Sequence, residues 1–485
     1  PGGTPPRGVR DPHAAPRGRP LYRIEAVPKH YAWGSKTRLQ AMFHLQPGEQ
    51  RNARLAEMWF SGHPQSPSPL TLPNGEQHDL LSEIHADPVA MVGEQASQEF
   101  GPVMPYLFKI ISAEIPLSLQ VHPVDFEARA GFNRENELNI ALDAPERSFK
   151  DSLAKNEMLV ALEPFSASVG FAPLAEQLRL LRAVNHPIAR NMVHALTART
   201  FHVGQPPQEY AACDVMMPMS SIAWPDSRRR IFRAFHVAIT APAVEAGSLE
   251  TALRHTLENL PELGRSQGAL HNAIEAAQAF ETDASVLCLL MMNPVELAEG
   301  ESVYIPAGLP HAYIHGTAAE IMTNSDNVLR AGMTVKHKDI ANLLHSLNCQ
   351  PAAPIDPSSS AFAALAIQDL ITYRPKISEY MLAYGRVDNA SGAWPIAGRL
   401  IQRYGELMQK YGPQRLQLPS NGPRVLLCTE GSLQCTTARR CVQLTQGEAV
   451  FIPAEDGRVE IGVNTKAGTD SRDSQGSYLF ASTPF

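Results

Sequence analysis

Three polar side chains alternate with apolar ones along the stretch "IPLSLQVHPVDF", at residues 115–126. Ser118, Gln120 and His122 are each two positions apart, and residues two apart on a strand point to the same face of a sheet. An imidazole and an amide oxygen are both plausible ligands for Zn²⁺ or a similar divalent ion. A half-buried strand with two hydrogen-bonded polar residues would give the same pattern, so the pair alone leaves the metal site open.

Two further candidate ligands belong to other apolar segments. Glu157 begins "EMLVALEPF" (157–165), which has the composition of a strand, and His311 follows a proline in "GLPHAYIHG" (308–316). Taken singly, a solvated carboxylate and a hydrogen-bonded loop histidine explain these residues equally well. The sequence pattern indicates only that the four candidate ligands could converge.

The secondary structure that the sequence predicts around these residues changes from strands to helices and back to strands along the chain. Short apolar runs broken by Pro, Gly and Asn predict strands from about 21 to 171. Between 172 and 284 the pattern is helical: Leu249 and Leu253 share one face of a helix for which Ser248 is the expected N-cap. From Ser285 onward, short strands separated by turn residues are typical of a jelly roll.

Two ten-residue segments, "EGESVYIPAG" (299–308) and "QGEAVFIPAE" (446–455), are alike in spacing and chemistry. Their similarity suggests two related β units. The first copy leads on to His311, whereas the second leads to Asp456, and all seventeen histidines precede residue 350. We therefore expect any metal in the first unit and a structural role for the second.

Composition excludes several classes of protein. A chain of 485 residues predicts two or three domains, and its net charge of −7 argues against a nucleic-acid partner. No apolar run reaches the length of a membrane helix, so we expect no membrane partner. Six scattered cysteines without a CxxC pair indicate reduced thiols and a cytoplasmic location. Residues 1–20, rich in Pro, Gly and Arg, are predicted to be a disordered extension.

Several blocks of sequence then carry a resemblance to a known family. They run in order, cover most of residues 21–345, and include "SDNVLRAGMTVK" (325–336), which is the most specific of them. The others are "YAWGSK" (31–36), "AEMWFSGHP" (56–64), "PYLFKIISAEIPLSLQVHP" (105–123), "LDAPERSFKD" (142–151), "PAGLPHAYIHG" (306–316) and the start of "EIMTNSDNVLRAGMTVK" (320–336). Together they resemble type I mannose-6-phosphate isomerase, of the cupin superfamily.

The resemblance implies a mainly β protein with two jelly-roll (cupin) domains and an inserted α-helical domain. The expected domains are a catalytic cupin domain at 21–171 with 285–345, a helical domain at 172–284, and a C-terminal jelly roll without metal at 346–485.

The same resemblance assigns roles to individual residues. The implied metal ligands are Gln120, His122, Glu157 and His311. The implied catalytic residues are Arg330, Lys155, Glu320 and Asp326, and the implied substrate-binding residues are Ser118, Lys336 and Tyr313. Trp33 and Lys109 also lie in matching blocks, and we expect them to act in packing.

The implied activity is the interconversion of mannose 6-phosphate and fructose 6-phosphate, with one Zn²⁺ per chain, in a monomer that belongs to carbohydrate metabolism and GDP-mannose biosynthesis. Moving a proton between C1 and C2 through an enediol needs a base near the α-carbon and a group that stabilises the developing oxyanion. A divalent ion suits the second task as a Lewis acid, and an arginine can stabilise an enediolate or bind phosphate. The sequence leaves the base open between Glu320 and Asp326.

One segment departs from the family pattern, which around the glutamate ligand is Asp-Pro-Asn-His-Lys-Pro-Glu. Here the histidine is Ala154 and the second proline is Asn156. The family histidine is proposed to assist opening of the sugar ring, and loss of the prolines is expected to loosen the backbone that presents Glu157. An impaired pseudoenzyme that binds a sugar phosphate is therefore one alternative, and another cupin enzyme, such as a metal-dependent oxygenase, is a second.

Overall fold

The computed structural model describes most of the chain. The described residues are 21–45, 53–72, 74–198, 224–260, 264, 266–367, 369–388, 394–409, 417–463 and 475–485. The extension predicted at residues 1–20 lies outside them. Within these ranges, none of the helices combines the length and the apolar character that a membrane span needs.

The first sheet has ten strands and carries the candidate metal ligands. Its main order is β10-β9-β12-β6-β3-β2, with β7, β8, β11 and β13 joined to it at the side. The strands are β2 (Val27–Lys29), β3 (Glu57–Phe60), β6 (Tyr106–Ala113), β7 (Leu119–Val121), β8 (Glu157–Ala161), β9 (Phe165–Phe171), β10 (Met292–Leu297), β11 (Ser302–Ile305), β12 (His311–Thr323) and β13 (Leu329–Gly332).

Strand β12 organises this sheet because it is long and pairs with four neighbours. Its first residue, His311, lies opposite Gln120 of β7, whereas Met322 near its other end lies opposite Glu157 of β8. The sheet therefore curls over itself, and its interior is filled by a buried apolar cluster that includes Leu159 and Val169. The alternation of apolar residues along these strands predicts such an interior.

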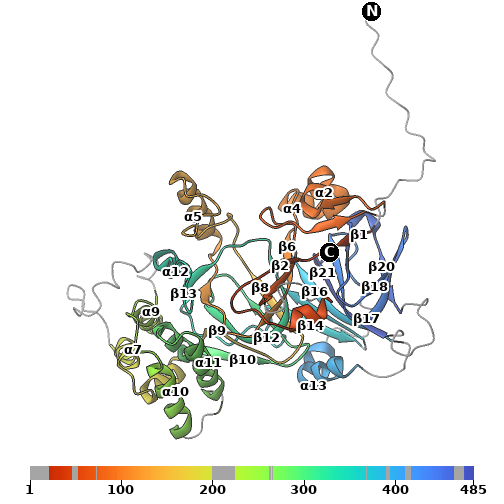
Figure 1. The fold of residues 1–485 in the computed structure, drawn as a ribbon. Coiled ribbons are helices and arrows are strands. Elements are labelled where there is room, and N and C mark those ends of the chain that lie inside the picture. The colour runs from red at the N-terminus through yellow and green to blue at the C-terminus, as the bar shows by residue number, and fades with distance from the viewer. Residues whose placement is uncertain are drawn as a thin grey trace, which may run out of the picture.

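The second sheet has eleven strands, in the main order β14-β15-β16-β21-β17-β19-β1-β4-β5, with β18 and β20 paired to β17. They are β1 (Tyr22–Ile24), β4 (Pro69–Thr71), β5 (Gln77–Asp79), β14 (Phe362–Ile367), β15 (Leu370–Pro375), β16 (Met381–Asp388), β17 (Arg424–Thr437), β18 (Cys441–Thr445), β19 (Ala449–Ile452), β20 (Val459–Gly462) and β21 (Gln475–Ser482). Strand β1 pairs with β19 through Tyr22 and Phe451, so the first described segment supplies strands to both sheets (Figure 1).

A group of helices lies between β9 and β10 in the chain and to one side of the first sheet (Figure 1). They are α6 (Leu174–Ala183), α7 (Pro187–Thr197), α9 (Asp226–Ile239), α10 (Ser248–Asn259), α11 (Ser266–Ala279) and the 3-10 helix η3 (Ala284–Met291). Leu249 and Leu253 of α10 are buried, as their spacing predicts. The expected cap is wrong by one residue: Ser248 is already helical, and Gly247 precedes it in a left-handed conformation, at φ +76°.

The remaining helices are distributed along the rest of the described chain. They are α1 (Arg38–Met42), α2 (Leu80–Ala86), α3 (Pro88–Val92), α4 (Glu94–Phe100), α5 (Asp125–Glu137), α12 (Ile340–Ser346), α13 (Pro395–Gln409) and the 3-10 helix η4 (Ala454–Asp456). The predicted fold class, mainly β with two β units and helices between their strands, is confirmed. The expected division into domains stays a prediction.

The two similar ten-residue segments take up the same local structure. Ile305 ends β11 and Ile452 ends β19, each directly before a proline. After the first copy the chain enters β12 at His311, and after the second it forms the short helix η4. The repeat seen in the sequence thus corresponds to equivalent strand ends in the two sheets.

Candidate active site

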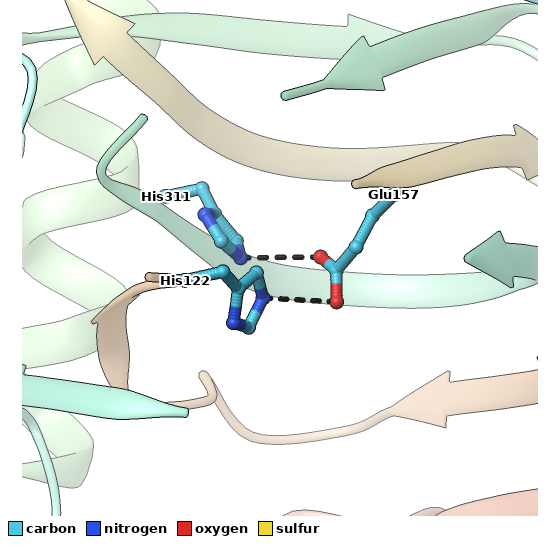
Figure 2. Close-up of side chains that lie close together, drawn as sticks. All are labelled: His122, Glu157 and His311. Carbon is cyan, nitrogen blue, oxygen red and sulfur yellow. Dashed lines mark ion pairs between the residues drawn. The ribbon is translucent and has the colours of Figure 1, made fainter. Parts of the chain in front are cut away.

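Three of the predicted metal ligands meet in the interior of the first sheet. His122, Glu157 and His311 are each at most 1% exposed, and their potential ligand atoms lie within 4.8 Å of one another. The two oxygens of Glu157 face the two rings: Oε1 is 2.9 Å from His122 Nε2, and Oε2 is 3.2 Å from His311 Nε2 (Figure 2). In the described ranges, this is the one such cluster of His, Cys, Asp and Glu.

Backbone carbonyls orient both imidazoles. His122 Nδ1 lies 2.8 Å from the carbonyl oxygen of Asn327, and His311 Nδ1 lies 3.0 Å from that of Leu309. Because a carbonyl only accepts, each Nδ1 carries the proton and each Nε2 directs a lone pair at Glu157. A histidine held in this way by its outer nitrogen is the usual arrangement at a metal centre.

The electrostatics of His122 and Glu157 fit a bound cation. Burial lowers the pKa of His122 to about 4, which keeps its ring neutral. Burial opposes ionisation of Glu157, whereas the Lys155 ammonium, 3.1 Å from Oε1, favours it and acts to lower the carboxyl pKa. Although His122 Nε2 lies close to the carboxylate, it forms no hydrogen bond. A buried lone pair facing a carboxylate is stabilised by a cation between them.

Gln120 lies beside this cluster, as the alternation of the strand predicts. Its amide Nε2 is 3.3 Å from His311 Nε2. The two ends of an amide exchange by a half-turn of the side chain, which would place Oε1 in the same position. The Gln120 side chain is therefore within reach of the cluster as a fourth donor.

A second layer of buried polar residues surrounds Glu157. The Tyr313 hydroxyl donates to Glu157 Oε2 at 3.2 Å and to Glu320 Oε1 at 2.9 Å. Glu320 Oε2 lies 3.3 Å from Lys109 Nζ, and Lys155 Nζ lies 3.1 Å from Glu157 Oε1. Burial raises the pKa of Glu320 despite the Lys109 charge beside it. Glu320, Tyr313 and Lys155 are thus within one contact network with the three candidate ligands.

Reasoning from sequence missed the part that Lys109 takes in this network. Its side chain is 5% exposed and forms ion pairs with both Glu320 and Glu57. Burial opposes its charge, but the two carboxylates outweigh this effect and raise the lysine pKa. The available signal was a single lysine in the otherwise apolar strand "YLFKIISA", since a buried lysine needs a partner.

The other predicted residues lie around the same end of the sheet. Arg330 of β13 is opposite Gln120 in the register of β7, and burial lowers its pKa. Asp326 precedes that strand, and its backbone N–H donates to Asp151 Oδ2 at 2.9 Å. The Lys336 ammonium lies 4.6 Å from the centre of the Tyr31 ring. The remaining two are Ser118, which is half-buried directly before β7, and Trp33, which packs against the interior cluster.

The segment that departs from the family pattern is well connected. Asn156 Oδ1 accepts from the backbone N–H of Ala307 at 3.0 Å, and its carbonyl accepts from the Tyr380 hydroxyl at 3.0 Å. Ala154 is half-buried in the segment that precedes them. The hydrogen bonds of Asn156 therefore restrain the backbone at a position where the family pattern has a proline.

Comparison with known proteins gives a consistent result. Residues 21–174 match the family described as phosphomannose isomerase type I, catalytic domain. The chain is 29% identical to mannose-6-phosphate isomerase of Salmonella typhimurium over 432 residues, which are 89% of this chain and 94% of that one. The corresponding protein of Emericella nidulans is 26% identical over 469 residues, covering 90% of this chain and 91% of that one.

Solved structures share the fold. A crystal structure of a phosphomannose isomerase variant from Salmonella typhimurium superposes with a TM-score of 0.72 at 24% identity, covering 96% of this chain and all of that one. A zinc-bound mannose 6-phosphate isomerase gives the same TM-score, identity and coverage. Residues 21–174 are thus similar to the type I phosphomannose isomerase catalytic domain, and the described chain shares the fold of solved phosphomannose isomerases.

Proposed function

We propose that this protein interconverts mannose 6-phosphate and fructose 6-phosphate. The observation that carries the proposal is the buried cluster of His122, Glu157 and His311, with two imidazole lone pairs directed at one carboxylate. Proteins that share most of their length with this chain are named for this isomerisation in bacteria and fungi.

We propose that His122, Glu157, His311 and Gln120 hold one Zn²⁺ per chain. Two nitrogens, a carboxylate and an amide oxygen make a donor set that suits zinc. When bound, the ion would polarise the carbonyl of the open-chain sugar and stabilise negative charge on its oxygen.

We assign the proton transfer between C1 and C2 to Glu320 rather than to Asp326. Glu320 is 3% exposed and its pKa is raised by burial, so that it can both take up and return a proton. Tyr313 bridges Glu320 to Glu157, which keeps the carboxyl beside the proposed metal. Asp326 is only half-buried, and its charge acts on Lys29, Arg330 and Lys336.

The cationic side chains would stabilise two negative charges: the one that develops on the enediol and the one on the substrate's phosphate. We place Lys155, next to Glu157, at the oxyanion that develops on the enediol, and Lys109 as the charge that restrains Glu320. Arg330, Lys336 and Ser118 would bind phosphate and hydroxyl groups of the sugar.

A metal assay combined with a turnover assay tests the proposal. We expect the purified protein to contain about one zinc per chain and to form fructose 6-phosphate from mannose 6-phosphate, with activity lost on chelation and restored by zinc. Glu157→Gln should lose both metal and activity, whereas Glu448→Gln on the second sheet should lose neither. Zinc without isomerisation would support the pseudoenzyme, and oxygen consumption with a redox metal would support an oxygenase.

We infer a cytoplasmic location as well. The five cysteines in the described residues are all free thiols, which a reducing compartment maintains. A monomeric state and a place in GDP-mannose biosynthesis stay predictions.

A further inference from the structure

Lys29 is held by an aromatic ring rather than by a carboxylate. It is the last residue of β2, and its Nζ lies 4.5 Å from the centre of the Trp59 ring. Its ammonium also donates to the Ser66 hydroxyl at 2.5 Å. Lys29 forms no ion pair with any described residue. An ammonium has three donors, so two of them remain available.

Two other cations also have no ion-pair partner among the described residues. Lys336 Nζ lies 4.6 Å from the centre of the Tyr31 ring, and neither Lys336 nor Arg330 forms an ion pair within the described part of the chain. Burial lowers the pKa of all three groups, so each would gain from a bound anion. The nearby charge of Asp326 acts on each of them without forming an ion pair.

Lys29 is also connected to the inner site. It lies opposite Glu57 in the register of β2 and β3. The Trp59 ring that contacts Lys29 also makes a cation–π contact with Lys109, whose Nζ lies 4.8 Å from the ring centre. Lys109 in turn pairs with Glu320. One indole ring thus joins an outer, unpaired cation to the buried network around the candidate metal ligands.

We infer that Lys29 is a further substrate-binding residue, which donates to the phosphate of the sugar together with Arg330 and Lys336. The inference rests on the proposed function. All three cations lie within electrostatic reach of Asp326, and Lys29 and Lys336 also of Glu57, yet none forms an ion pair in the described part of the chain. A phosphate dianion would give each of them a hydrogen-bonding partner of opposite charge. Lys29 would therefore determine selectivity for the phosphorylated sugar.

Two variants separate charge from packing. Lys29→Met keeps the long stem on the Trp59 ring and removes the charge, whereas Lys29→Arg keeps the charge. We expect Lys29→Met to raise the KM for mannose 6-phosphate about tenfold or more, the loss typical of a hydrogen bond to a charged group, with kcat changed less than about twofold. Lys29→Arg should restore most of the affinity. Lys376→Met, at an exposed lysine near the second sheet, is the control for net charge.

Titration with inorganic phosphate, followed by calorimetry, gives a readout that needs no turnover. We expect Lys29→Met to weaken phosphate binding by a factor similar to the rise in KM, and Lys376→Met to leave it unchanged. Unchanged phosphate affinity, or a fall in kcat without a change in KM, overturns the inference even if the enzyme is active. If the protein does not isomerise mannose 6-phosphate but still binds phosphate through Lys29, the proposed function is overturned and the anion site is retained.

Discussion

Asn156 Oδ1 accepts a hydrogen bond from the backbone N–H of Ala307 at 3.0 Å. Asn156 directly precedes Glu157 of β8, and Ala307 lies in the turn between β11 and β12, just before His311. A single side chain therefore links the segments that present two candidate metal ligands. It stands where the family pattern has a proline.

We predict that Asn156→Ala weakens both the fold and the metal site. Removing the acceptor leaves the Ala307 N–H without its partner, at a cost of about 1–2 kcal/mol in the free energy of unfolding. Zinc affinity, measured by competition with a chelator, should fall by about three- to tenfold. Asn342→Ala, which removes an asparagine amide from α12, serves as a control. Unchanged zinc affinity in Asn156→Ala would show that the link has no bearing on the metal.

Ala154→His tests the missing histidine. The side chain at this position is half-buried beside Lys155, so the new imidazole can enter without displacing a core residue. We expect the metal content, measured by elemental analysis, to stay constant while turnover of mannose 6-phosphate rises several-fold. Ala154→Gln adds similar bulk without a titratable ring and controls for packing. If both variants leave turnover as it was, ring opening does not depend on this position.

Tyr313→Phe should separate metal binding from proton transfer. The hydroxyl bridges Glu157 and Glu320, and its loss leaves Glu320 without a restraint on one oxygen. We expect kcat to fall by about 10- to 100-fold with the zinc content retained, because the loss affects the proton carrier and not the ligands. Tyr373→Phe removes a buried hydroxyl of β15, in the second sheet, that donates to the carbonyl of Gly300 between β10 and β11, and it should leave kcat unchanged. Loss of zinc from Tyr313→Phe would assign the hydroxyl to the metal site instead.

We predict that Asp456, in η4, makes the free energy of unfolding depend on pH. Both of its carboxylate oxygens are buried without a hydrogen bond, and burial raises its pKa to about 6. Between its unfolded value, about 3.9, and about 6, the folded protein binds more protons than the unfolded chain, so this group lowers stability as the pH rises through that window.

Asp456→Asn should therefore raise the thermal unfolding midpoint at pH 7.5 relative to the unsubstituted protein, with little difference at pH 4. Asp369→Asn, at a carboxylate that is 43% exposed and paired with Arg386, is the comparison. A lower midpoint for Asp456→Asn at pH 7.5 would mean that attraction to Arg439 outweighs burial.

Local spacing was enough to select Gln120 and His122 as a possible pair, whereas the resemblance to a known family was needed to assign all four candidate ligands. Gln120 and His122 share a face because a strand alternates, and His311 follows a recognisable strand end. The role of Lys109 could not be predicted in this way. It depends on the pairing of β6 with β12, which brings Glu320 opposite Lys109, and strand pairing between distant segments is not encoded in a local pattern.

The first residue of α10 was also not predicted correctly from the sequence. Serine is a good N-cap by propensity, but here its hydroxyl donates to the carbonyl of Glu245 while glycine takes the left-handed position before the helix. The exchange of strands between the sheets was also invisible locally, because β1, β4 and β5 are short and resemble any other edge strands.

The pairing of β1 with β19 has a consequence for biosynthesis. Phe451 follows its partner Tyr22 by 429 residues in the chain, so β1 emerges from the ribosome long before the strand that completes it. Domains of large proteins often fold in order of synthesis. Here β1 cannot pair until β19 has been made, and the strands of the first sheet, which lie between them in the chain, are synthesised while that edge of the second sheet is still open.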